Sequence, residues 1–268
     1  MNKAFLRTLF TITCLLQFIF GAEIVTANEK DTLRIITYNI HHANPPSKPG
    51  LIDLEAIAAV INQNKPDLVA LQEVDVNNRR SGKNLNEAAA LGSLTGMHHH
   101  FVKAIDYEGG AYGVAILSKW PIQQKDSLIL PMAEGSNGEP RVLAIVAVEP
   151  KPGKPLVFAS THLDLKEQNR LLQAEAIVKK LSTYSQPVIL GGDFNAKPES
   201  DVINHFDTYF SRSKTSGSAA FTIPEVNPDR EIDFIMFRPK KRFQSVRHEV
   251  IKEPYASDHL PVMVELTY

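Results

Sequence analysis

The chain has 268 residues, of which 43% are hydrophobic and 22% are charged, and its formal net charge is −1. This composition is typical of a globular protein and excludes a disordered, collagen-like or many-span membrane protein. The near-neutral charge also excludes a basic surface over the whole molecule, although a local basic patch for nucleic acid remains compatible with it.

Residues 1–27 have the features of an export signal. Lys3 and Arg7 precede a nearly continuous apolar run over residues 9–21, and small residues occupy the cleavage-site positions in residues 25–27. The run is shorter than the roughly 20 residues that a membrane-spanning helix needs. We therefore predict a cleaved signal peptide and an exported protein, in the periplasm, envelope or medium, with an uncleaved anchor as the alternative.

Cleavage would leave a mature chain of residues 28–268 with a net charge of −2 and without Cys14, the single cysteine. Such a chain has no disulfide, so cysteine proteases and cysteine-ligated zinc sites are excluded. No glycine- or proline-rich linker and no repeat divides it, which predicts one domain. We expect a monomer without a membrane span.

Strand-like and helix-like segments alternate along the mature chain. A β-branched run predicts a strand at 33–40, and apolar residues at helical spacing predict a helix at 53–64. Further strands are expected at 67–72, 100–104, 113–117, 123–128, 142–148, 156–161, 188–190, 232–237, 246–250 and 262–266, and further helices at 85–95 and 166–183. This order predicts an α/β architecture with mixed sheets.

Polar side chains stand at or near the ends of several of these strands: Asn39, His41, Glu73, His162, Asp193, Asn195, Asp258 and His259, with Asp233 inside a strand. Ligands of open α/β sheets bind at strand ends, so these groups can converge on one cleft. Each also has an ordinary explanation on its own, as a turn residue, a surface pair or a satisfied buried group. Glu73 stands out because a carboxylate beside a buried strand is costly unless it is paired or binds a metal.

Three segments are more specific when they occur in this order: Leu71-Gln72-Glu73, Gly192-Asp193-Phe194-Asn195 and Ser257-Asp258-His259-Leu260-Pro261. With them, the chain from Leu33 onwards resembles the endonuclease/exonuclease/phosphatase superfamily, which includes deoxyribonuclease I, exonuclease III, neutral sphingomyelinases and inositol polyphosphate 5-phosphatases. The resemblance implies a four-layer α/β sandwich, in which two mixed β-sheets pack face to face with helices outside. It also implies hydrolysis of phosphate esters.

By this resemblance, oxygen ligands would hold a divalent cation, Mg²⁺ or else Mn²⁺ or Ca²⁺: Asn39, Glu73 and Asp258. Asp193 would orient or deprotonate the attacking water, and Asn195 would hold the phosphoryl group. His259 would contact the phosphate or act as acid or base, with Asp233 fixing its tautomer. His162 would be the second catalytic histidine.

Three arginines and a tyrosine form a second group of candidates. Arg141, just before the strand at 142–148, is expected to bind phosphate, and Arg79 belongs to a basic loop that can reach substrate phosphates. Tyr112 follows two glycines in an expected flexible loop and can line the substrate entrance, and Arg170 is expected to orient an acidic side chain near the site. For Arg141 and Arg79 the alternative is a solvated surface position.

The motifs leave the substrate open, because the fold is shared by enzymes with different substrates. A nuclease needs several Lys and Arg along the phosphate chain, and only residues 76–84 are densely basic. A lipid hydrolase would expose apolar loop tips, for which Trp120, Tyr209 and Phe210 are modest candidates. We rank an endonuclease-like enzyme first, then a phospholipid or sphingomyelin phosphodiesterase and a phosphatase of soluble esters. A non-catalytic binding module and a metal-independent glycosidase are the alternatives of a different class.

Overall fold

The computed structural model describes residues 32–214 and 220–268, and residues Asp31–Tyr268 form one compact unit. The predicted signal peptide at residues 1–27 lies outside the described part. Within the described residues, no helix combines the length and the apolar character needed to cross a bilayer.

Two mixed sheets of six strands form the centre of the unit. The first sheet has the order β11-β12-β1-β2-β4-β3. Its strands are β1 (Thr32–Asn39), β2 (Leu68–Val76), β3 (His98–Tyr107), β4 (Gly110–Ser118), β11 (Gln244–Val250) and β12 (Val262–Thr267). Only the pair of β1 and β2 is parallel in this sheet, so the polar residues at their carboxyl ends lie side by side.

The second sheet has the order β5-β6-β7-β8-β10-β9. Its strands are β5 (Gln124–Ile129), β6 (Val142–Lys151), β7 (Lys154–His162), β8 (Val188–Asp193), β9 (Ser211–Arg212) and β10 (Asp233–Arg238). The strand register pairs His162 with Asp193 and Asp193 with Asp233. Three residues that are far apart in sequence thus become neighbours through backbone pairing alone.

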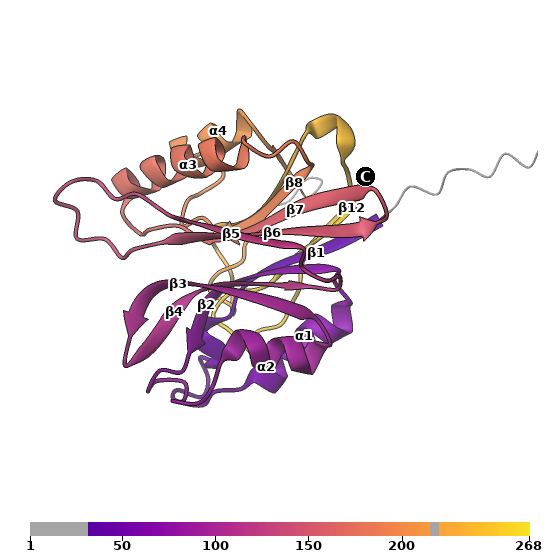
Figure 1. Cartoon of the computed structure of the whole chain (residues 1–268). Helices are drawn as coiled ribbons and strands as arrows, with labels where there is room; N and C mark the ends of the chain where they lie inside the picture. Colours follow the sequence, from indigo (N-terminus) through magenta and orange to yellow (C-terminus); the bar gives the residue numbers. More distant parts are fainter. Residues whose placement is uncertain (1–31, 215–219) are drawn as a thin grey trace, which may run out of the picture. The chain divides into compact units, whose positions relative to one another are not determined.

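Four helices cover the outer faces of the two sheets (Figure 1): α1 (Leu54–Asn64), α2 (Glu87–Thr95), α3 (Glu167–Leu181) and α4 (Asp201–Asp207). The first two pack on the first sheet, and the other two pack on the second sheet. A third hydrophobic layer lies between the sheets, where Ile35 and Leu68 meet Phe158 and Val146. The fold is therefore the four-layer α/β sandwich that the family resemblance predicted.

Differences from the predicted elements are confined to their ends and to short segments. The predicted strand at 67–72 continues to Val76, and the one at 188–190 continues to Asp193. These extensions were hidden because they run through the polar residues of the site. The seven-residue helix α4 and the two-residue strand β9 were not predicted, since neither is long enough to show a periodic pattern.

Candidate active site

Strands β1, β2 and β8 bring an amide and two carboxylates together. Asn39 Nδ2 donates to Glu73 Oε1 at 3.0 Å and to Asp193 Oδ2 at 3.1 Å. The amide oxygen of Asn39 accepts from the backbone N–H of His41, which holds the orientation of the side chain. Since Glu73 belongs to the first sheet and Asp193 to the second, the Asn39 side chain links the two sheets at the site.

Glu73 lies at an irregularity in β2. Its φ is +59°, and the register with β4 shifts between Leu71 and Val74. A non-glycine residue in this left-handed region costs about 1–3 kcal/mol and persists only where the surrounding structure holds it. Here the regular pairing of β2 with β4 on both sides of the irregularity holds it. Such bulges re-aim a side chain, which explains how a residue within an extended strand contacts Asn39.

Asp193 is the centre of the cluster. Its side chain is buried, with Oδ2 at 3.4 Å from His162 Nε2 and 3.7 Å from His259 Nε2. Its other oxygen accepts from the backbone N–H of Asn195 at 2.9 Å. Burial raises the pKa of Asp193, and the nearby carboxylate of Asp233 raises it further. Asp193 is therefore placed to accept a proton more readily than an exposed carboxylate.

His259 and Asp233 form a buried pair. His259 Nδ1 lies 2.9 Å from Asp233 Oδ2, and Thr222 Oγ1 donates to the same oxygen at 2.5 Å. Burial alone would lower the pKa of His259, but the carboxylates of Asp233, Asp193 and Asp258 together outweigh it and raise the pKa to about 10. The pair fixes the imidazole so that Nε2 points toward Asp193.

His162 is held in the opposite protonation state. It is buried, and its Nδ1 lies 3.1 Å from Arg141 Nη1. Burial and the charge of Arg141 hold the pKa of His162 well below its usual range, so the ring is neutral. A guanidinium only donates hydrogen bonds, so Nδ1 must accept, and the proton of the neutral ring is on Nε2, facing Asp193. The two histidines beside Asp193 thus differ in charge.

The structure places the remaining predicted catalytic and metal residues around this centre. Asn195 donates through Nδ2 to the carbonyl of Leu163 at 2.9 Å, and its φ is +47°. Asp258 is half-buried and close enough to His259 for its charge to raise the pKa of that ring. The structure therefore brings the residues predicted as catalytic or metal-binding together around Asp193.

Arg141 has the surroundings expected of a phosphate-binding residue. It is buried, its Nη1 pairs with Glu139 Oε1 at 3.0 Å as well as with His162, and its Nε is buried without a hydrogen-bond partner. Tyr112 lies nearby, since both Glu73 and Arg141 influence its pKa, which burial raises far above the usual value. Contrary to prediction, Tyr112 is not in a flexible loop but is buried within β4.

One further prediction needs correction, and another stays a prediction. Arg79 is exposed and its backbone pairs with Glu108, so its contact with substrate phosphates remains a prediction. Arg170 orients no acidic side chain, since its Nη1 donates to the carbonyls of Asp164 and Leu165 at 3.3 and 2.7 Å. A pattern of sequence can place an arginine near a site, but its long side chain leaves the choice of partner to the tertiary structure.

Sequence reasoning placed Arg80 in the basic loop at 76–84 without its partner, and it missed Thr222. Arg80 forms a two-point ion pair with the buried Asp75, with both bonds at 2.9 Å, and its guanidinium lies over the rings of Tyr107 and Tyr112 at 4.5 and 5.6 Å. The signal that could have revealed it was Asp75, a carboxylate in an apolar strand that needed a buried partner. No local signal marks Thr222, whose partner Asp233 is 11 residues away.

Asp193, Asp233 and His259 also form a compact group whose potential metal-ligating atoms lie within 4.8 Å of one another. His259 Nδ1 and Asp233 Oδ2 are hydrogen-bonded to each other. The other oxygen of Asp233, Oδ1, is buried without a hydrogen-bond partner. The site thus offers two sets of donors, an all-oxygen set around Asn39 and Glu73 and a mixed set around His259.

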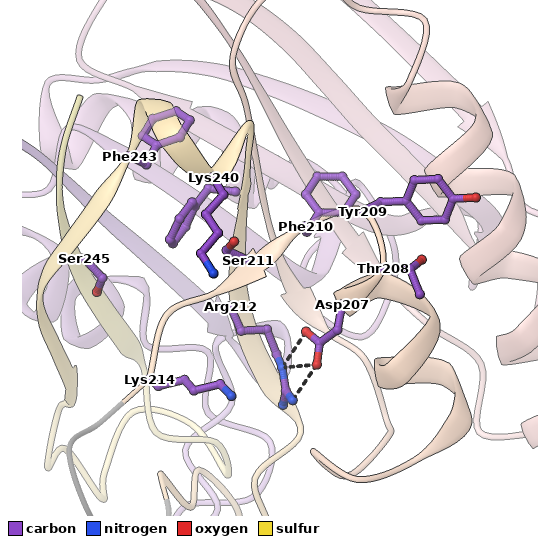
Figure 2. Close-up of a pocket in the computed structure, with 11 residues that line it drawn as sticks. Asp207, Thr208, Tyr209, Phe210, Ser211, Arg212, Lys214, Lys240, Phe243 and Ser245 are labelled. Carbon is purple, nitrogen blue, oxygen red and sulfur yellow. Dashed lines mark hydrogen bonds and ion pairs between the residues drawn. The ribbon is translucent and has the colours of Figure 1, made fainter.

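A hollow of about 620 Å³ lies elsewhere, beside β9 (Figure 2). None of the residues of the candidate active site lines it, and Arg212, which does, is ion-paired with Asp207 at 2.7 Å. The candidate active site is therefore defined by converging polar groups rather than by this hollow.

The model of the endonuclease/exonuclease/phosphatase family matches residues 36–259, which span all the contacts from Asn39 to His259. The chain belongs to this family. As a member of the endonuclease/exonuclease/phosphatase family, it is a hydrolase that acts on phosphoester bonds.

Individual relatives are distant. Sphingomyelinase C of Bacillus cereus is 24% identical over 219 residues, which cover 71% of this chain and 65% of that protein, so the chain spans less than two thirds of its relative. A family protein from Bacteroides thetaiotaomicron matches with a TM-score of 0.73 at 19% identity, covering 90% of this chain and 99% of that one. A mannosyl-6-phosphatase from the same organism matches with a TM-score of 0.72 at 20% identity, covering 88% and 100%. At these identities, the structural likenesses show the fold alone.

Proposed function

We propose that the protein is an exported, monomeric, divalent-metal-dependent phosphodiesterase that acts on a phospholipid of the sphingomyelin type. The observation that carries the preference for a diester is the pairing of Arg141 with Glu139 at 3.0 Å. The carboxylate of Glu139 partly neutralises the cation at the expected phosphate position. Such a position suits the single negative charge of a phosphodiester better than the double charge of a phosphomonoester.

Two further observations favour a lipid substrate over nucleic acid. A sphingomyelinase is among the relatives of this chain. In the basic loop at 76–84, Arg80 is hydrogen-bonded to Asp75. Outside this loop, Arg170 on α3 is hydrogen-bonded to a backbone carbonyl. Neither arginine is therefore free to bind a phosphate chain. A nuclease stays the second candidate, because Arg79 and Lys83 are exposed and available to a phosphate chain.

The residues present fit a divalent cation. Glu73 and Asp193 direct carboxylate oxygens at the same Asn39 amide, and oxygen donors of this kind suit Mg²⁺ or Mn²⁺. Glu73, Asn39 and Asp258 would hold the ion. When bound, the ion neutralises charge on the phosphate and on the leaving oxygen.

The chain's own side chains supply the remaining steps. Arg141 binds a non-bridging phosphate oxygen, with the neutral His162 beside it, and Asn195 holds the phosphoryl group. Asp193 orients the attacking water and accepts its proton as the new P–O bond forms. His259, held by Asp233, directs Nε2–H at the phosphate or at the leaving oxygen as the old P–O bond breaks.

Hydrolysis assays with a set of esters test this function. The substrates are sphingomyelin in mixed micelles, bis-p-nitrophenyl phosphate, p-nitrophenyl phosphate and plasmid DNA, each with Mg²⁺, Mn²⁺ or EDTA. We expect EDTA-sensitive release from sphingomyelin and from the soluble diester, with little from the monoester. Cleavage of DNA alone would establish the nuclease instead, and activity that survives EDTA would contradict the metal mechanism.

A charge variant isolates the role of Glu139. Glu139→Gln removes the negative charge beside Arg141 and should shift the ratio of monoester to diester hydrolysis several-fold toward the monoester. The exposed Glu175 on α3 provides the control variant Glu175→Gln, which should leave the ratio unchanged. An unchanged ratio in both variants would remove the electrostatic argument for a diester.

A further inference from the structure

A second hollow, of about 480 Å³, lies next to the segment that carries His259. Six of its lining residues are apolar: Phe221, Val226, Pro228, Val250, Pro254 and Leu260. We call it the apolar groove. Its volume is within the range of about 300–1,000 Å³ that is usual for small-molecule sites.

The apolar groove is joined to the catalytic pair by covalent and hydrogen bonds. Leu260 in its wall directly follows His259, and Phe221 directly precedes Thr222. The backbone N–H of Leu260 donates to the carbonyl of Thr222 at 2.6 Å, while Thr222 Oγ1 donates to the carboxylate of Asp233 at 2.5 Å. The same two segments therefore present polar groups to the reaction site and apolar groups to the groove.

The loop that forms one wall is held closed by its own backbone. Both Asp229 and Arg230 donate N–H bonds to the carbonyl of Ile223, at 3.0 and 3.1 Å, and Thr222 donates to the carbonyl of Arg230 at 2.8 Å. A groove that is already formed needs no ordering of its walls when a ligand binds, which favours affinity.

Two exposed apolar side chains belong to the lining of the groove. Phe221 is 40% exposed and Val226 is 57% exposed. Adjacent exposed apolar side chains mark binding sites more often than single ones do. The two charged lining residues, Glu225 and Lys252, have opposite signs, so the rim offers no net positive charge to a polyanion.

We propose that the apolar groove binds a hydrocarbon chain of the substrate while the phosphodiester lies at His259. This inference rests on the proposed phosphodiesterase function and narrows its substrate to amphiphiles whose chain begins close to the phosphate. Continuity between the groove wall and the His259–Asp233 pair is what assigns the groove to the substrate rather than to a separate ligand. A chain in the groove removes apolar surface of both partners from water, which supplies binding energy.

A direct binding measurement tests the groove without catalysis. Dodecylphosphocholine, below its micelle concentration and in EDTA, is titrated calorimetrically into the full-length protein and two variants. The first variant, Val226→Asp, puts a charge into the groove. The control, Val246→Asp, puts the same charge on β11 at a valine that is 51% exposed and does not line the groove.

We expect the wild type to bind with a negative heat-capacity change, which is the mark of apolar burial. Val226→Asp should weaken binding at least tenfold, and Val246→Asp should leave it unchanged. Absence of binding by the wild type, or equal affinity in all three proteins, would contradict the proposal that the apolar groove binds a hydrocarbon chain. Thermal unfolding of each variant verifies that it is folded.

Kinetics then separate this inference from the proposed function. Val226→Asp should lower kcat/KM at least tenfold for a long-chain phosphocholine diester and leave it unchanged for bis-p-nitrophenyl phosphate. If the protein bound the hydrocarbon chain in the groove but hydrolysed no phosphodiester, the proposed function would be contradicted and the role of the groove in chain binding would stand. If the protein hydrolysed the soluble diester but Val226→Asp left kcat/KM for the long-chain substrate unchanged, the proposed role of the groove would be contradicted and the proposed function would stand.

Discussion

The two sheets supply different chemistry to one site. The first sheet contributes oxygen donors, in Asn39 and Glu73, whereas the second contributes the buried group of His162, Asp193 and Asp233. Oxygen donors without an imidazole suit a hard cation. A carboxylate within 4 Å of two imidazoles suits the handling of protons. The difference teaches that each sheet supplies its own kind of group, and that Asn39 and His259, which lies between two strands of the first sheet, contact the group of the second sheet. We therefore expect the oxygen donors to bind the cation and the group around Asp193 to handle protons.

Removal of Glu73 is the most severe way to test this division. Glu73→Ala should lower kcat/KM by about a thousandfold or more, because the contribution of a cation to phosphoryl transfer is several kcal/mol. Calorimetric titration with Mn²⁺ should show that affinity for the ion is lost as well. The control Glu175→Ala should change neither quantity. Retained Mn²⁺ affinity in Glu73→Ala would move the metal site to the group around His259.

Changes on the proton-handling side should separate catalysis from metal binding. His259→Ala and Asp233→Asn should each lower kcat by about 10²–10⁴, the usual range for general acid–base catalysis. Mn²⁺ affinity, measured by the same titration, should remain close to that of the wild type. A loss of affinity as large as in Glu73→Ala would show that the division between the sheets is wrong.

Arg141 should affect substrate binding more moderately. Arg141→Ala should reduce kcat/KM about 10–100-fold, since a charged hydrogen bond contributes about 1.5–3 kcal/mol. Arg141→Lys keeps the charge but loses the planar donor, so its loss should be intermediate. Arg247, which is exposed on β11, gives the control variant Arg247→Ala. Steady-state kinetics with bis-p-nitrophenyl phosphate would contradict the assignment if all four proteins behaved alike.

A buried carboxyl outside the site should govern part of the pH dependence of stability. The carboxyl group of Glu87 accepts a hydrogen bond from the backbone N–H of Asp75. Burial raises the pKa of Glu87 from 4.5 to about 8. Between these values the unfolded chain releases a proton that the folded chain keeps. The free energy of unfolding should therefore fall as pH rises from about 4.5 to about 8, with no further contribution above pH 8.

Urea denaturation of Glu87→Gln checks this smaller effect. The amide keeps an oxygen acceptor without a titrating proton, so the variant should gain stability relative to the wild type when the pH is raised from 5 to 8.5. Glu175→Gln, at an exposed position, serves as the control. If the difference between Glu87→Gln and the wild type did not change with pH, Glu87 would not be the group that titrates.

The sequence was most informative where polar residues interrupt apolar strands. Glu73 stood out because a carboxylate beside a buried strand is costly, whereas Asp193 and His259 were assigned through the resemblance of their motifs to the superfamily. The structure brings the three into one site. Arg170 shows the limit of this reasoning. The structure pairs it with backbone carbonyls rather than with an acidic side chain, because no local pattern encodes the partner of a long side chain.

By itself, the sequence determined the alternation of strands and helices, because periodicity is a local property. Its ordered motifs also carried the resemblance to the family and, through it, the candidate residues of the site. Only the tertiary structure decided the left-handed backbone of Glu73, the different charge states of His162 and His259, and the link from Thr222 to Asp233. The apolar groove also belongs to this second group, since Phe221 and Leu260 are 39 positions apart. These features depend on burial and on contacts between distant segments, which exist only after the two sheets have packed together.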